Sequence, residues 1–171
     1  KRARTSLETV VSMVQNGIEE VRRIQMDLRP PTLDDLGILA TISWFCREFQ
    51  KIYSGIRIDQ QIDIREDEVP DPLKTIIYRV MQESLNNVVK HSKADRVRLS
   101  LRKRNGTVEL TIEDNGQGFD PGNVLSVESS NRGVGVSSMK ERTEFSGGSF
   151  SIESTEGKGT IVWASWPRGK H

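Results

Sequence analysis

Carboxylates and glycines at short spacings mark one stretch of this 171-residue sequence as a place where chemistry could occur. Asp114 ends an alternation of apolar and polar residues, and Gly116 and Gly118 follow it at a spacing of two. The glycines let backbone approach a ligand more closely than any Cβ would allow. A flat ligand could therefore dock beside the carboxylate. Asp-Asn-Gly is also an ordinary turn sequence, and that alternative stays open on these residues alone.

A second stretch places polar side chains along one side of a helix. Glu83, Asn87 and Lys90 lie at positions i, i+4 and i+7, which share one line on a helix. The amide oxygen of Asn87 is a suitable ligand for Mg²⁺, a hard cation that is commonly shared between protein oxygens, phosphates and water. The alternative is a solvated helix face on which His91 complements the C-terminal dipole.

Two glycine pairs follow further along the chain. Gly133 and Gly135 open a predicted helix, where free backbone N–H groups can meet phosphate oxygens, and Gly157 and Gly159 precede Thr160. A lone Gly-x-Gly is weak evidence. The Gly133–Gly135 pair belongs neither to a Walker sequence nor to a dinucleotide-binding fingerprint.

In this order, the four stretches resemble the N, G1, G2 and G3 boxes of the GHKL ATPases, and within them the catalytic and ATP-binding domain of sensor histidine kinases. The segment from Leu28 to Leu39 resembles the junction after the first dimerisation helix in the nitrate-sensor-like family of these kinases. The resemblance covers nearly the whole chain. The family carries its phosphoacceptor histidine on the first bundle helix, but only His91 and His171 occur here, so we expect no phosphorylation of this chain on the family's site.

The resemblance implies ATP and Mg²⁺ as cofactors and assigns a role to each box. Glu83 would be the catalytic residue that orients or activates the attacking group, Asn87 would hold Mg²⁺, and Asp114 would accept a hydrogen bond from the exocyclic amine of adenine, supported by Thr160. ATP rather than GTP follows. The implied ATP-binding residues are Asn87, Lys90, His91, Asp114, Gly116, Gly118, Phe119, Gly133, Val134, Gly135, Val136 and Thr160. The loop from Asp120 to Arg132 matches the family's ATP lid; the alternative is a simple surface connection.

Hydrophobic periodicity predicts the elements that position these residues. Strands are expected near 56–64, 96–103, 107–113, 149–153 and 160–166, with an Asn105-Gly106 hairpin turn between the second and third. Helices are expected from Asp71, as N-cap, through the Glu83 box, and from Gly133 to Phe145. This pattern predicts an α/β fold, a two-layer sandwich of the Bergerat or GHKL ATPase type, with a mixed sheet and helices on one face.

The N-terminal third is predicted to be helical. Leu7, Val14, Val21 and Leu28 recur by sevens, as in a coiled coil or bundle, and Pro30-Pro31 should end that helix. A second helix is expected from Thr32 or Asp34 to about Gly55. We therefore divide the chain into a helical arm, residues 1–54, the remnant of a dimerisation and phosphotransfer bundle, and an ATP-binding catalytic domain, residues 55–171.

Composition narrows the function further. Lys+Arg of 25 against Asp+Glu of 24 gives a net charge of +1, which does not favour nucleic acid as a partner. Cys46 lies among Trp44, Phe45 and Phe49, so a buried thiol is expected. Leu36 to Cys46 is too short an apolar stretch to span a membrane. The first residue is Lys1, so we expect a longer protein whose sensor or membrane segments lie elsewhere.

The predicted function is phosphoryl transfer from ATP to a histidine, with a response regulator receiver domain as the later recipient. We expect a homodimer through the helical bundle of the whole protein, and the cytoplasmic portion of a bacterial sensor kinase, with membrane anchoring left open. The alternatives are another GHKL ATPase, such as a serine-phosphorylating anti-sigma factor or an ATP-driven clamp, and a regulatory pseudokinase that binds nucleotide.

Overall fold

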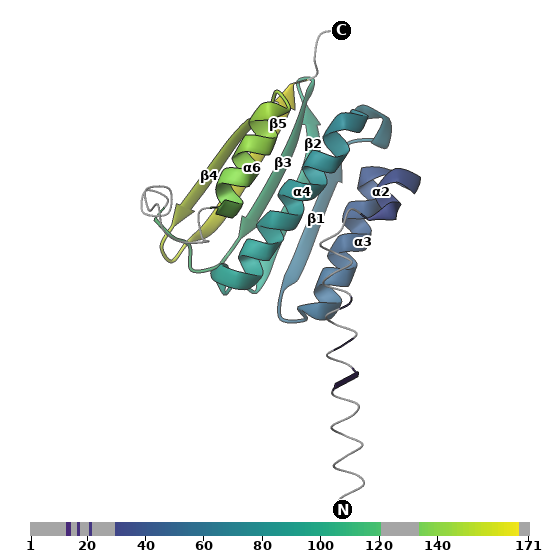
Figure 1. Cartoon of the computed structure of the whole chain (residues 1–171). Coiled ribbons are helices and arrows are strands. Elements are labelled where there is room, and N and C mark those ends of the chain that lie inside the picture. Colours follow the sequence, from purple (N-terminus) through teal and green to yellow (C-terminus); the bar gives the residue numbers. More distant parts are fainter. Residues whose placement is uncertain (1–12, 15–16, 18–20, 22–29, 121–133, 168–171) are drawn as a thin grey trace, which may run out of the picture.

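The structure, a computed structural model, describes residues 30–120 and 134–167, together with residues 13, 14, 17 and 21. The predicted first helix and lid loop lie, apart from single positions, outside these ranges. The elements in chain order (Figure 1) are α2 (Pro31–Asp35), α3 (Gly37–Ile52), β1 (Arg57–Asp63), the 3-10 turn η1 (Glu66–Glu68), α4 (Asp71–Asn87), the π-helical turn η2 (Val88–Ser92), β2 (Arg96–Arg104), β3 (Thr107–Asp114), α6 (Val134–Phe145), β4 (Ser149–Thr155) and β5 (Gly159–Pro167).

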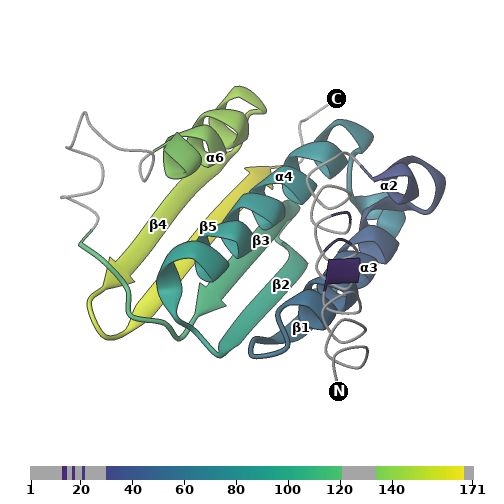
Figure 2. The same ribbon diagram turned by 60° about the horizontal axis from the view of Figure 1, so that its bottom comes forward.

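A five-stranded sheet forms one layer of the fold, in the order β1-β2-β3-β5-β4. β1 runs parallel to β2, whereas the other neighbouring strands are antiparallel. α3, α4 and α6 lie side by side across one face of this sheet, as Figure 1 and the turned view in Figure 2 both show. The predicted two-layer α/β sandwich with a mixed sheet is confirmed.

Alternation along the central strands decides which face the helices cover. Six alternating residues of β2 and β3 are at most 3% exposed: Val97, Leu99, Leu101, Val108, Leu110 and Ile112. The apolar stripe of α4 packs on this face, with Ile77, Val80, Met81 and Leu85 fully buried. Burial contributes about 1.5–3 kcal/mol for each such side chain. The stripe fixes the rotation of α4 about its axis and therefore the side on which its polar residues emerge.

The hairpin between β2 and β3 forms as its sequence predicts. Asn105 and Gly106 have φ of 50° and 80°, the left-handed values that a tight two-residue turn requires. The turn sets the register in which Val97 pairs with Asp114. A local sequence signal thus delivers Asp114 to the end of the central strand.

The predicted single helix from Thr32 or Asp34 to Gly55 is wrong, because the chain forms two helices there. α2 begins at Pro31, and Asp34 lies inside it without capping. The break follows at Gly37, whose φ of +81° does not belong to a continuous helix. α3 ends at Ile52, before Gly55. The start of α4 is also shifted by one residue, since Pro70 rather than Asp71 holds the capping position.

α3 belongs to the same hydrophobic core as the sheet. Phe45 on α3 meets Tyr78 on α4 edge to face, with ring centroids 5.7 Å apart. Cys46 is fully buried, and desolvation raises the pKa of its thiol to about 12, so it stays a neutral small hydrophobe as predicted. In the described part of the chain, no helix combines the length and the apolar character that crossing a membrane requires.

Candidate functional site

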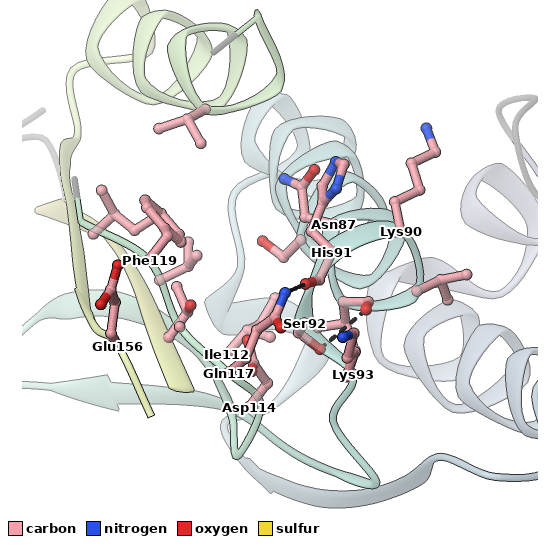
Figure 3. Close-up of a pocket in the computed structure, with 18 of the residues that line it drawn as sticks. Asn87, Lys90, His91, Ser92, Lys93, Ile112, Asp114, Gln117, Phe119 and Glu156 are labelled. Carbon is pink, nitrogen blue, oxygen red and sulfur yellow. Dashed lines mark hydrogen bonds between the residues drawn. The ribbon is translucent and has the colours of Figure 1, made fainter. Parts of the chain in front are cut away.

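A cavity of about 730 Å³ opens where the end of α4 meets the loop after β3 and the β4–β5 hairpin. Figure 3 shows Asn87 and His91 on one side of it and Phe119 and Glu156 on the other. Eight predicted ATP-binding residues line this cavity: Asn87, Lys90, His91, Asp114, Gly118, Phe119, Val136 and Thr160. Residues from four separate stretches of sequence therefore meet at one place.

Asp114 occupies the floor of the cavity. It is 7% exposed and pairs with Thr160 across β3 and β5. Burial raises the pKa of its carboxyl group, as does the nearby charge of Glu113, and the backbone N–H groups of Gly116 and Thr160 oppose the rise. The Gly116 N–H donates to Oδ1 at 2.8 Å. The carboxylate thus offers an acceptor that is largely shielded from solvent, which suits recognition of an amine on a flat ring.

Gly116 and Gly118 allow neighbouring backbone segments to pack closely against the loop after β3. A Cβ on Gly116 would lie 2.7 Å from Oδ1 of Asp114 and still closer to the Ser92 carbonyl. Gly118 has φ +62°, and a Cβ there would overlap the carbonyl of Thr155. Gly116 does not line the cavity. Close packing of three backbone segments therefore explains this glycine spacing, and it fixes the floor around Asp114.

The end of α4 supplies the opposite wall. Asn87 is the last residue of α4, and the π-helical turn η2 carries Lys90 and His91. This wider turn displaces Lys90 from the straight line with Glu83 and Asn87 that regular helical spacing predicts. Figure 3 shows the Asn87 amide beside the His91 ring, with Lys90 extending to the outside. An amide oxygen and two basic side chains thus border the mouth of the cavity.

Glu83 lies outside the cavity lining, one helical turn back from Asn87. A Cβ on Gly135 would overlap Oε1 of Glu83, so the carboxylate faces the first turn of α6. Val134 is 67% exposed, Val136 is 7% exposed, and Gly133 lies outside the described residues. Among the described residues of the Gly133–Val136 box, Val136 lines the cavity, whereas Val134 and Gly135 do not.

Several lining residues escaped the sequence reasoning. An apolar wall comes from Ile112, Ile152 and Val162, which the strand patterns assign only to the core. Ser154 links two parts of the site, because its Oγ accepts from the Phe119 N–H at 2.9 Å and lies 2.9 Å from the Thr160 hydroxyl. The feature that could have identified Ser154 is the register of β4 and β5, which pairs Ser154 with Thr160. The cavity is also bordered by Lys93, Gln117, Asp120 and Glu156. Their residue types alone do not predict a place in the site.

The fold and this site define a class of ATPase. The sequence profile of the family described as "Histidine kinase-, DNA gyrase B-, and HSP90-like ATPase" matches residues 73–170, which include all four boxes. The chain belongs to this family. The predicted resemblance is confirmed.

Particular relatives are sensor kinases. The chain is 33% identical over 150 residues to the oxygen sensor histidine kinase NreB of Staphylococcus carnosus, which covers 88% of this chain and 42% of NreB. It is 32% identical over 155 residues to the histidine-protein kinase/phosphatase DegS of Brevibacillus brevis, covering 91% of this chain and 39% of DegS. The chain spans about two fifths of the length of these curated relatives.

Solved structures share the fold. The histidine kinase domain of the blue-light activated histidine kinase of Erythrobacter litoralis EL346 superposes with a TM-score of 0.62 at 22% identity, over 75% of this chain and 59% of that one. Full-length ShkA in complex with AMPPNP gives a TM-score of 0.61 at 19% identity, over 77% of this chain and 29% of ShkA.

Proposed function

We propose that this chain is the ATP-binding catalytic domain of a sensor histidine kinase, which transfers the γ-phosphoryl group of ATP to a histidine outside this chain for relay to the receiver domain of a response regulator. The observation that carries the proposal is the cavity that joins the buried Asp114 carboxylate to Asn87, Lys90 and His91. One end suits a purine amine and the other suits phosphates.

Adenine recognition rests on the floor of the cavity. The Asp114 carboxylate accepts from the exocyclic amine, while Ile112, Ile152 and Val162 contact the faces of the ring. Guanine carries a carbonyl where adenine carries this amine, so it would place an acceptor against an acceptor. A site built around a hydrogen bond rejects the analogue that cannot form it, which predicts selectivity for ATP over GTP.

The phosphate end fits a single Mg²⁺ ion shared with the nucleotide. In the described ranges no cluster of three or more His, Cys, Asp or Glu side chains could hold a metal by itself. An amide oxygen from Asn87 together with phosphate oxygens and water is a common coordination set for Mg²⁺. When bound, the ion neutralises charge on the phosphates. Lys90 and His91 add positive potential or hydrogen-bond donors at this end.

Glu83 is the proposed catalytic residue that orients or activates the attacking group. Its carboxylate lies against Gly135 at the start of α6, one turn from Asn87. This position outside the cavity lining also favours a second candidate, a regulatory pseudokinase that binds nucleotide without transferring its phosphoryl group. Both candidates need the same ATP pocket, and phosphoryl transfer separates them.

The remaining parts of the proposal concern the whole protein. We place residues 1–54 in the arm that leads from a homodimeric helical bundle, and the chain in the cytoplasmic portion of a bacterial sensor kinase. Within this arm, α2 and α3 contribute side chains to the same hydrophobic core as the sheet, so this part of the arm would pack on the catalytic domain.

Calorimetric titration with Mg-ATP tests the pocket. The wild-type chain should bind Mg-ATP and show little affinity for Mg-GTP, and Asp114→Asn should abolish ATP binding because the amide presents a donor where a carboxylate accepts. Asp63→Asn, on the exposed end of β1, is the matched control and should bind as wild type does. A folded wild-type chain that binds no ATP would refute the pocket.

Adding a histidine-bearing bundle segment of a related kinase, with radiolabelled ATP, then tests catalysis. Transfer that Glu83→Gln removes while ATP binding persists supports the kinase. Binding without transfer in the assembled protein supports the pseudokinase.

A further inference from the structure

Gln117 connects three parts of the candidate site through short hydrogen bonds. Its side-chain Nε2 donates to the carbonyl oxygen of His91 at 2.7 Å, drawn in Figure 3. Its backbone N–H donates to the Ser92 carbonyl at 2.7 Å, and its own carbonyl accepts from the Gly157 N–H at 2.7 Å. The residue therefore bridges the end of η2 and the β4–β5 hairpin from the loop between them.

The end of η2 needs such partners. The last carbonyl groups of a helix receive no hydrogen bond from N–H groups of the same helix. In addition, π-helical turns are rare and are found mostly at functional sites. After Ser92 the chain leaves the turn through Lys93, which has φ 56° in the left-handed region. The His91 and Ser92 carbonyls therefore point to the loop after β3, where Gln117 satisfies both.

The adjacent loop residues do not substitute for Gln117. Gly116 and Gly118 have no side chains. The Asn115 amide is engaged on the other side of the loop, donating to Oδ1 of Asp95 at 2.7 Å and accepting from the Arg96 N–H at 3.0 Å. The side-chain contact from this loop to the His91 carbonyl thus depends on the Gln117 amide.

We propose that Gln117 is a positioning residue, which holds η2, the turn that carries Lys90 and His91, beside the phosphates of the bound nucleotide. This inference rests on the proposed function of the same cavity. The side-chain amide acts through the backbone of His91, because one of its two N–H groups donates to that carbonyl. Loss of the donor should leave adenine recognition at Asp114 intact and weaken the contribution of the basic side chains.

A double-mutant cycle with Mg-ATP tests the proposal. Gln117→Met keeps the length of the side chain and removes the donor, and Lys90→Met removes one group that the donor is proposed to position. In the wild-type background Gln117→Met should weaken Mg-ATP binding about tenfold, the effect of losing one good hydrogen bond. In the Lys90→Met background the same change should cost less than about threefold, because coupled residues are not additive. The exposed Gln61→Met on β1 is the control and should change neither affinity.

The outcomes are distinct from those that test the pocket. Failure of the wild-type chain to bind Mg-ATP refutes the proposed function, whatever Gln117 does. When the wild type binds, an equal loss in both backgrounds shows that Gln117 touches the nucleotide directly or only stabilises the fold, and it overturns the positioning role. No loss in either background also overturns it. Gln117→Asn, which keeps the amide but is one methylene too short to reach, should behave as Gln117→Met; wild-type affinity in this variant would contradict the required 2.7 Å bond to His91.

Discussion

The backbone N–H of Ile38 donates a 2.9 Å hydrogen bond to Oε1 of Glu66, a residue 28 positions further along the chain. The Leu39 N–H donates to the other carboxylate oxygen at 3.0 Å, and Lys74 on α4 lies 2.9 Å from Oε1. A carboxylate at the start of a helix satisfies free N–H groups and complements the dipole. Glu66 therefore caps α3 and joins it to α4. Gly37 leaves room for it, because a Cβ there would overlap the carboxylate.

Glu66→Ala should lower the free energy of unfolding by about 1 kcal/mol, the usual cost of losing a helix cap. Urea denaturation followed by circular dichroism measures the change. Asp67→Ala, one residue away and paired with the exposed Arg65, is the matched control and should stay within about 0.5 kcal/mol of wild type. If both changes lowered the free energy of unfolding equally, Glu66 would not act as a helix cap.

The same cap has a pH dependence. Partial burial opposes ionisation of Glu66, but hydrogen bonds from Leu39, Lys74 and Ile38 together hold the pKa of its carboxyl below the ordinary value. A lowered pKa in the folded state stabilises the protein above the unfolded pKa, and this stabilisation is lost as pH falls through the folded pKa. The difference in stability between wild type and Glu66→Ala should therefore narrow in acid.

Asp114→Asn should stabilise the nucleotide-free protein, in contrast to Glu66→Ala, and should raise its melting temperature at pH 7. Burial raises the pKa of the Asp114 carboxyl, so the ionised group costs stability at neutral pH. That cost shrinks as pH falls through the raised folded pKa and is gone below the unfolded pKa, where the carboxyl is neutral in both states. We expect a gain of about 1–4 °C at pH 7 that vanishes toward acid, measured by scanning calorimetry. A variant less stable than wild type at pH 7 would contradict the prediction.

Gly118→Ala should lose both stability and nucleotide affinity. Alanine at φ +62° is strained, and its Cβ would displace the carbonyl of Thr155, the residue before the cavity-lining Glu156. We expect a loss of about 1–2 kcal/mol in stability and at least about tenfold weaker Mg-ATP binding. Gly106→Ala is the matched control, because Gly106 has φ +80° with open space around it, so strain should lower its stability and leave ATP affinity unchanged.

Ser154→Ala should weaken Mg-ATP binding by about threefold to tenfold, because the Phe119 N–H loses its acceptor and Thr160 loses a hydroxyl partner. Calorimetric titration gives the affinity. Ser151→Ala, on the same strand with an exposed side chain, should bind as wild type does. Unchanged affinity in Ser154→Ala would show that Phe119 needs no such support.

Local patterns predicted most of the sheet and the central helix. The alternation in Thr107–Asp114, the Asn105-Gly106 turn and the stripe from Ile77 to Leu85 all appear as expected, since each depends on neighbours in sequence. The break before α3 was not predictable in this way, because its cap comes from Glu66 after an intervening strand. Regular helical spacing also predicts a straight helix through Lys90, whereas the π-helical turn changes that geometry.

The structure brings eight of the predicted ATP-binding residues to one cavity, whereas Glu83 and Gly116 lie outside its lining. Asp114 and Thr160 were assigned to one pocket, and the β3–β5 register places them opposite each other. Ser154 and Gln117 form hydrogen bonds between segments that are distant in sequence. No sequence pattern shows that these segments lie close together in space. Glu83 shares a helix face with Asn87, yet its surroundings are set by the packing of α6 beside α4.

The pairing of Asp114 with Thr160 has a kinetic consequence. β3 and β5 are neighbours in the sheet, although α6 and β4 lie between them in the chain. Closing so long a loop is entropically costly and is expected late in folding, so the floor of the cavity does not exist in early, locally structured states. A nucleotide that binds only the completed floor should slow the unfolding rate and leave the refolding rate nearly unchanged.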